Sequence, residues 1–109
     1  MKFKFKITED TTLEDVEKEL VGLCEVPVPE LPLAHIEKLV VGYLNAERVK
    51  STGSMVRFRH PLVPTYGNYF GVHAIHKGRD EVLVLKKNYK QYLYPILVGI
   101  IDKMKNGNS

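Results

Sequence analysis

Three segments with strand-like patterns follow one another in the second half of this 109-residue chain. Residues 54–60 (SMVRFRH) alternate in polarity, residues 68–76 (NYFGVHAIH) are aromatic and β-branched, and residues 81–85 (EVLVL) are apolar. A loop, PLVPTYGN at 61–68, joins the first two segments, and a turn, KGRD, joins the last two. This order predicts an antiparallel meander.

Helical patterns lie on both sides of the meander. Before it, residues 33–46 place apolar side chains at helical spacing, with Asn45 as a C-terminal stop and His35 off the apolar stripe, in solvent. After it, residues 88–105 carry a wide apolar face that Pro95 interrupts. Such a helix either kinks at Pro95 or begins with Pro95 as its first residue after a short turn.

The N-terminal part predicts a further strand and helix. In KFKFKI (2–7), lysines alternate with apolar residues, as in a half-buried strand at the edge of a sheet. Residues 13–23 predict a helix, because Thr12 and Asp15 resemble a capping box ahead of an apolar stripe. The proline-rich stretch CEVPVPELP (24–32) then predicts an extended connection.

Together these segments predict one α+β domain over residues 1–109. Residues 33–105 form its core, a three-stranded antiparallel meander flanked by helices in the order α-β-β-β-α, and residues 1–30 form an N-terminal β-α extension. The hydrophobic content of 44% is sufficient for a buried core. Because the helices cover one face of such a sheet, we expect the other face to be open to solvent.

Charge is distributed unevenly along the chain. Residues 1–50 hold seven basic and ten acidic residues, a net charge of −3, whereas residues 51–109 hold nine basic and three acidic residues, a net charge of +6. The basic half is the better candidate for contact with a polyanion, although an ordinary soluble surface has the same composition. With a single cysteine, Cys24, and no apolar run as long as a membrane span, we expect a cytoplasmic protein.

Two arginines stand out on the first strand of the meander. Alternation places Arg57 and Arg59 on one face together with Met55, and it turns Val56 and Phe58 toward the core. A guanidinium group matches phosphate oxygens in a bidentate way. The next strand can add Tyr69 and His73 to this face, and a basic face with aromatic neighbours suits RNA better than the grooves of duplex DNA. An ordinary solvated face with two arginines remains the alternative.

Three histidines, His60, His73 and His76, lie in the same region. An imidazole can transfer protons near neutral pH, as RNA cleavage requires. The spacing of His73 and His76 puts them on opposite faces of a strand, which argues against a shared metal ion. We favour His76 for proton transfer, since it ends a strand beside the basic residues Lys77 and Arg79. We expect Lys77, Arg79 and His73 to bind the nucleic acid together with the two arginines of the first strand. No phosphate-binding loop or dinucleotide-binding glycine pattern occurs, so no cofactor is expected.

Two short motifs, GSMVRFRHP (53–61) and AIHKGRDEV (74–82), precede the last predicted helix. In this combination the chain resembles the HicA toxins, small mRNA interferases with a double-stranded-RNA-binding-domain-like (dsRBD-like) fold. The matching residues are Gly53, Ser54, Phe58, His60 and Pro61 in the first strand, and Ile75, His76, Lys77 and Gly78 after it. The resemblance covers residues 33–105 and implies RNA as the target and an antitoxin protein as a partner.

One residue departs from the family pattern. The family's catalytic histidine directly follows Gly-Ser, and here that position is Met55, which neither takes nor gives a proton. The resemblance therefore implies an RNA-binding scaffold, possessing endoribonuclease activity only if His60, His73 or His76 takes over the missing role. The family itself does not support that replacement.

A function of a different class stays open. The chain is then a non-enzymatic module that pairs with another protein, or with itself, through the edge strand KFKFKI or through the apolar loop LVPTYGNYF (62–70). The apolar residues of that loop are Leu62, Val63, Tyr66, Tyr69 and Phe70. Burial of the loop in the core is the other explanation for its composition.

Overall fold

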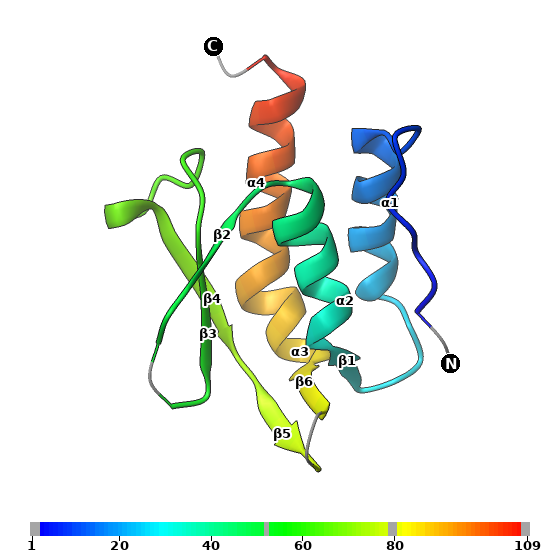
Figure 1. The fold of residues 1–109 in the computed structure, drawn as a ribbon, viewed down its shortest axis with the longest axis vertical. Helices are drawn as coiled ribbons and strands as arrows, with labels where there is room; N and C mark the ends of the chain where they lie inside the picture. Colours follow the sequence, from blue (N-terminus) through cyan, green and yellow to red (C-terminus); the bar gives the residue numbers. More distant parts are fainter. Residues whose placement is uncertain (1–2, 52, 79–80, 108–109) are drawn as a thin grey trace.

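The computed structural model describes residues 3–51, 53–78 and 81–107. The longer helices stand side by side, one sheet lies along one side of them, and a second small sheet lies at their lower end (Figure 1). In chain order the elements are α1 (Leu13–Leu23), β1 (Glu30–Pro32), α2 (Leu33–Glu37), the π-helical η1 (Lys38–Tyr43), β2 (Glu47–Val49), β3 (Met55–Arg59), the short 3₁₀ turn η2 (Tyr66–Asn68), β4 (Tyr69–His73), β5 (Ile75–Lys77), β6 (Glu81–Leu85), α3 (Lys86–Asn88), the π-helical η3 (Tyr89–Leu93) and α4 (Tyr94–Lys105).

Both sheets are antiparallel and have three strands, in the orders β2-β3-β4 and β1-β6-β5. Only Ala74 separates β4 from β5, so one extended segment pairs with β3 in its first half and with β6 in its second half. The structure confirms the α+β class and the antiparallel order of the three expected strands.

Two strands, β1 and β2, lie outside the predicted meander, and the prediction of a single three-stranded sheet is wrong. β1 comes from the proline-rich stretch predicted as a connection and pairs with β6, whereas β2 follows the second helix and pairs with β3. Each is three residues long, too short for its own side-chain pattern to reveal it. Both strands form where a longer neighbour offers a free edge.

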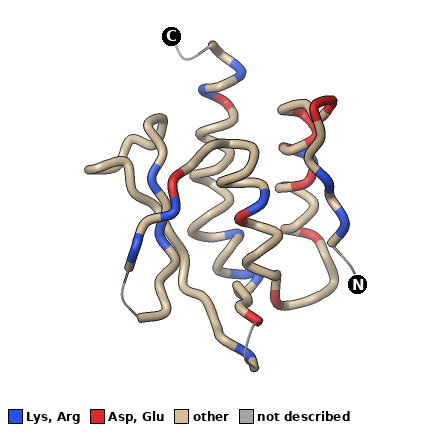
Figure 2. Tube along the Cα trace, viewed as in Figure 1, with Lys and Arg blue, Asp and Glu red and all other residues tan. Residues whose placement is uncertain are grey.

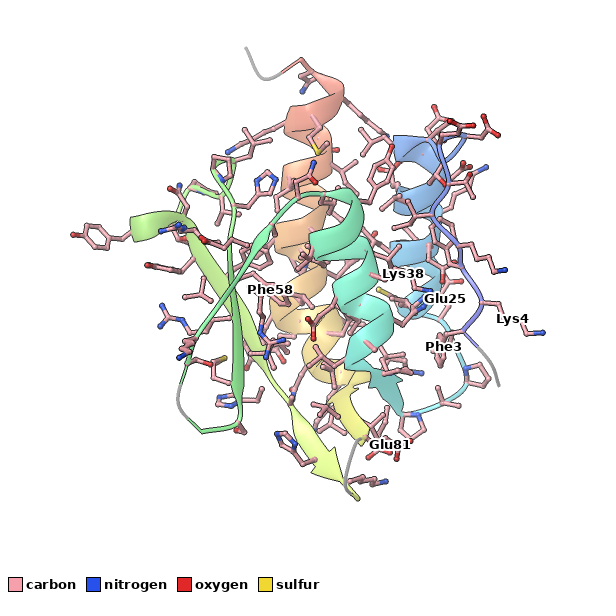
Figure 3. All side chains as sticks on the ribbon, in the orientation of Figure 1. Phe3, Lys4, Glu25, Lys38, Phe58 and Glu81 are labelled. Atoms are coloured by element: carbon pink, nitrogen blue, oxygen red, sulfur yellow. The ribbon has the colours of Figure 1, made fainter. Side chains whose placement is uncertain are left out.

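The strand predicted at residues 2–7 is also wrong for the part that the structure describes, residues 3–7. This segment is extended and its side chains alternate between half-buried and exposed, but it pairs with no strand. Phe3 and Phe5 pack against the hydrophobic core, while Lys4 points away from it (Figure 3). Lys38 Nζ donates to the Phe5 carbonyl oxygen at 2.7 Å. The alternating pattern therefore arises because every second side chain contacts the helices, and not because the segment belongs to a sheet.

Two helical predictions are confirmed in detail. Helix α1 spans residues 13–23, and its capping box is present: the Asp15 N–H donates to Thr12 Oγ1 at 3.1 Å, and the Thr12 N–H donates to Asp15 Oδ2 at 3.0 Å. The second helix, α2 with η1, ends before Asn45, whose φ of 65° lies in the left-handed region that stops a helix.

His35 corrects the prediction for the second helix, because its side chain is buried rather than solvated. Its Nε2 atom lies 2.7 Å from Glu19 Oε2 of α1, and its ring packs against Phe3 with 5.2 Å between ring centroids. The second helix is thus covered on a second side by α1 and the N-terminal segment, which the apolar stripe alone does not indicate.

The last helical region runs continuously from α3 through η3 to α4. Pro95 lies in the first turn of α4, near the start that the second alternative predicted, but the helical α3 and the π-helical turn η3 come before it in place of the predicted short turn. A π turn shifts the hydrogen-bond ladder by one residue, which accommodates the missing N–H of proline without breaking the helix. Tyr89 and Leu93 of η3 are fully buried, so this region anchors the core.

Candidate nucleic-acid interface

The sheet β2-β3-β4 has an inner face against the helices and an outer face. Val56 and Phe58 are buried on the inner face, and Phe58 lies between sheet and helices in Figure 3. The alternation predicted for β3 is therefore confirmed, with Arg57 half-buried and Arg59 exposed on the other side. The strand register assigns to this outer face Glu47 and Val49 of β2, Met55, Arg57 and Arg59 of β3, and Tyr69, Gly71 and His73 of β4.

Arg57 lies across the sheet on the ring of Tyr69. Its guanidinium carbon is 4.6 Å from the ring centroid, a cation–π geometry. Gly71 is directly opposite Arg57, and a Cβ atom there would lie 3.3 Å from Arg57 Cγ and 2.4 Å from the Val56 carbonyl oxygen. The absent side chain at Gly71 gives Arg57 its path across β4. A guanidinium group that contacts a ring in this way can still donate its N–H groups to an anion.

Arg59 is less available than the sequence indicates. It forms an ion pair with Glu47, which is opposite it on β2. Both side chains are about half exposed, 48% and 58%, and exposed pairs of this kind contribute little stability. The pair reduces the positive charge of the outer face, although separating two such exposed charges costs little free energy.

A surface pocket of about 340 Å³ lies at the end of this sheet, beside the start of β3. It brings the Gly53–Met55 turn together with His76 of β5, so residues from the two resembling motifs meet there. Its basic side chains are Arg48 and Lys50. The lining residues are Leu33, Arg48, Val49, Lys50, Ser51, Gly53, Ser54, Met55, Val56, His76 and Val82.

The three predicted histidines have different surroundings. His76 is exposed and lines the pocket. His73 is exposed on the outer face opposite Met55, with its Nδ1 atom 3.1 Å from Ser54 Oγ. His60 is buried, its Nε2–H donates to the Leu44 carbonyl oxygen at 2.8 Å, and its Nδ1 accepts the Leu62 N–H at 3.1 Å. Both nitrogens of His60 are occupied within the fold, so we do not place it in the candidate site.

Two further predicted residues lie outside the pocket lining or the described part of the chain. Lys77 forms an ion pair with Glu30 of β1, with Nζ and Oε1 2.8 Å apart. The hydrogen bond to Glu30 raises the pKa of Lys77 and holds its side chain toward β1, across the second sheet. Arg79 lies outside the residues that the structure describes.

Lys50 and Arg48 are basic residues at the pocket that the sequence prediction missed. Arg48 lies in β2 and Lys50 lies on the hairpin that follows it, and the sequence pattern does not reveal β2. Arg48 also faces the helices, where its Nη1 atom is 2.8 Å from Glu37 Oε1. Lys50 is exposed, and among the described residues it has no carboxylate partner. Figure 2 shows basic residues along β2 and β3, whereas acidic residues gather at α1 and the loop before it.

The surfaces proposed for a protein-interaction module are only partly present. In the loop 62–70, Val63 and Phe70 are buried and Leu62 packs against the core, which favours the core explanation. Tyr66 differs, since its side chain is 100% exposed. Residues 3–7 lie on the helices rather than at the edge of a sheet.

Within the described ranges, no helix combines the length and the apolar character that crossing a membrane requires. In the same part of the chain, no three side chains of His, Cys, Asp or Glu are arranged to hold a metal ion. No known protein family, curated protein or solved structure matches this chain.

Proposed function

We propose that this chain is an RNA-binding domain resembling the HicA toxins. RNA contacts the outer face of the sheet β2-β3-β4 and the pocket beside it. The observation that carries the proposal is the position of Arg57, which lies on a sheet face away from the helices and close to the basic pocket. The dsRBD-like arrangement, a cytoplasmic location and an antitoxin partner belong to the same proposal.

The charges of this region support binding of a phosphate backbone. Arg57 is held by Tyr69 rather than by a carboxylate, and Lys50 is exposed at the mouth of the pocket. Arg59 becomes available when a phosphate replaces Glu47. Two of these cations lie on β3 and the third lies on the hairpin before it, so together they can follow one phosphate backbone.

Binding is better supported than cleavage. Cleavage at a 2′-hydroxyl needs one group to take a proton and another to give one. Of the predicted histidines, only His76 lines the pocket, and Met55 occupies the position where the family carries its catalytic histidine. His76 is therefore the residue on which any retained cleavage depends.

The proposal is tested by the fluorescence anisotropy of a labelled RNA titrated with the protein at low salt. We expect binding that weakens as salt is added. Binding releases the cations that surround the phosphates, and this release becomes less favourable as the salt concentration rises. Arg57→Ala should weaken it about tenfold, whereas Lys18→Ala, which removes a lysine from the acidic helix α1, should leave it unchanged. Absence of binding at low salt, or equal losses in both variants, contradicts the proposal.

Cleavage is measured on the same RNA by gel electrophoresis. His76→Ala should remove any cleavage while it leaves binding measurable. Cleavage that persists in this variant, in a preparation free of contaminating nuclease, contradicts the role given to His76.

A further inference from the structure

Among the described residues, no strand pairs with the outer edge of β4. The His60 N–H donates to Asn68 at 3.0 Å and the Ala74 N–H donates to Ser54 at 2.8 Å, so even-numbered residues of this segment face β3. In an antiparallel pair the intervening residues point the other way. The backbone groups of Tyr69, Gly71 and His73 therefore point away from β3, and β4 is the last strand of its sheet. The Tyr69 carbonyl oxygen accepts from Thr65 Oγ1 at 2.6 Å, so the open part of the edge lies at Gly71 and His73.

A slot results because β6 stops early. On this same edge, β6 pairs with β5 through Ile75, His76 and Lys77, and the chain then turns into helix α3 at Lys86. Within the described residues, no strand continues along β4. The slot runs along Gly71 and His73 of β4, and the β5–β6 pairing, which ends at Ile75 and Leu83, limits it at one side.

The other strand edges are protected in ways that β4 is not. Edge strands are usually shortened, charged or interrupted by proline, which prevents pairing with other chains. β1 has three residues and contains Glu30 and Pro32, and β2 and β5 also have three residues and carry charges. β4 has five residues, YFGVH, without lysine, arginine, acid or proline. This contrast points to an edge that is kept open.

A second copy of the chain fits this slot poorly. Two β4 strands paired around Gly71 would place Tyr69 of one copy opposite His73 of the other. Continuing the β5–β6 register places Leu85 beside His73, so β6 of each copy would meet the loop 61–68 of the other. A segment without a neighbouring strand of its own avoids this collision.

The charges around the slot define the chemistry of that segment. On the outer face, Arg57 lies across β4 and His73 is exposed, so side chains of an added strand on this face lie beside basic groups. On the inner face, β4 packs against η3, and Phe70 and Val72 are buried there. An added strand that alternates acidic and apolar side chains satisfies both faces.

We propose that β4 binds an extended segment of a partner protein by strand addition, and that this segment alternates acidic and apolar residues. Main-chain hydrogen bonds to Gly71 and His73 give the affinity, and the alternating side chains give the selectivity. Arg57 contributes to both proposals, but strand addition uses the backbone edge of β4, so its test requires no RNA.

The probe is a short synthetic peptide in which glutamate alternates with valine, added to ¹⁵N-labelled protein. We expect shifted amide resonances and slower hydrogen exchange at Gly71 and His73. His73→Pro removes the N–H that points into the slot without removing a bond to β3, and it should bind the peptide about tenfold more weakly than His73→Ala, which keeps that N–H.

Three results overturn the proposal. Unchanged exchange at Gly71 and His73 in the wild-type protein excludes strand addition, whether or not the proline variant folds. Equal affinity for a peptide with lysine in place of glutamate excludes the acidic partner. Dimerisation that depends on protein concentration and protects the same two amides assigns the slot to a second copy.

Discussion

Arg57 and Tyr69 lie on neighbouring strands, with the guanidinium carbon 4.6 Å from the centroid of the ring. Gly71, which is opposite Arg57 and two residues after Tyr69, makes this contact possible because it carries no side chain. The position of Arg57, the main candidate for phosphate binding, thus depends on the absence of a side chain at Gly71.

Gly71→Ala should therefore destabilise the fold. The new Cβ would lie 2.4 Å from the Val56 carbonyl oxygen, so β3 and β4 must separate, and overpacking of this kind costs about 1–3 kcal/mol. Urea denaturation measures the change in the free energy of unfolding. Gly99→Ala is the control, because nothing lies within 4 Å of its added Cβ and alanine favours a helix by about 0.5–1 kcal/mol. Equal destabilisation by both variants contradicts the close approach at Gly71.

Glu47→Gln should raise the affinity for RNA. It removes the carboxylate that pairs with Arg59. This carboxylate has the same sign of charge as phosphate, so its loss should increase the affinity for RNA about threefold to tenfold at low salt. Anisotropy titrations measure the gain, which should shrink as salt is added. Glu17→Gln, which breaks the pair with Lys105, changes the net charge equally and serves as the control. The same gain in both variants would mean that only the net charge matters.

Substitution of His60 should lower the stability of the protein, whereas substitution of His76 should lower its affinity for RNA. His60→Ala leaves the buried Leu44 carbonyl without its partner, at a cost of about 1–3 kcal/mol, and it also removes the acceptor of the part-buried Leu62 N–H. His76→Ala alters an exposed side chain and should change stability by less than about 0.5 kcal/mol while it weakens RNA binding. Denaturation and anisotropy on both variants test the contrast. If a stably folded His60→Ala protein lost RNA binding, His60 would contribute to the binding site after all.

Sequence patterns predict those parts of the fold whose signal is local. The capping box of Thr12 places the start of α1, Asn45 ends the second helix, and the alternation around Phe58 orients β3. These features depend on neighbours within a few residues, and each is confirmed.

The features that sequence patterns miss depend on distant contacts. β2 exists because β3 offers it an edge, and it brings Glu47 against Arg59. His35 is buried by Phe3 and Glu19, and the buried position of His60 depends on Leu44 at the end of a different element. Predictions for the site fail in the same way, since accessibility is decided by segments far away in the chain.

Tyr89 should make the protein sensitive to alkaline pH. Its side chain is fully buried and its hydroxyl donates to the Leu20 carbonyl oxygen at 2.7 Å, in the last turn of α1. Burial raises the pKa of Tyr89 above the value of about 10 for an unfolded chain. Because the folded pKa is the higher one, its contribution is complete below about pH 10 and is lost as the pH rises above that value.

Tyr89→Phe isolates this contribution from other groups that titrate in the same window, such as Lys77 and Lys105, whose pKa values are raised by ion pairs. Near pH 7 the variant should lose about 1 kcal/mol with the hydrogen bond to Leu20. Between about pH 9 and 11 its stability should fall less steeply than that of the wild type, whereas Tyr92→Phe, at an exposed position, should keep the wild-type slope. Urea denaturation at a series of pH values measures both slopes. A Tyr89→Phe slope equal to that of the wild type would mean that Tyr89 does not ionise on unfolding in this range.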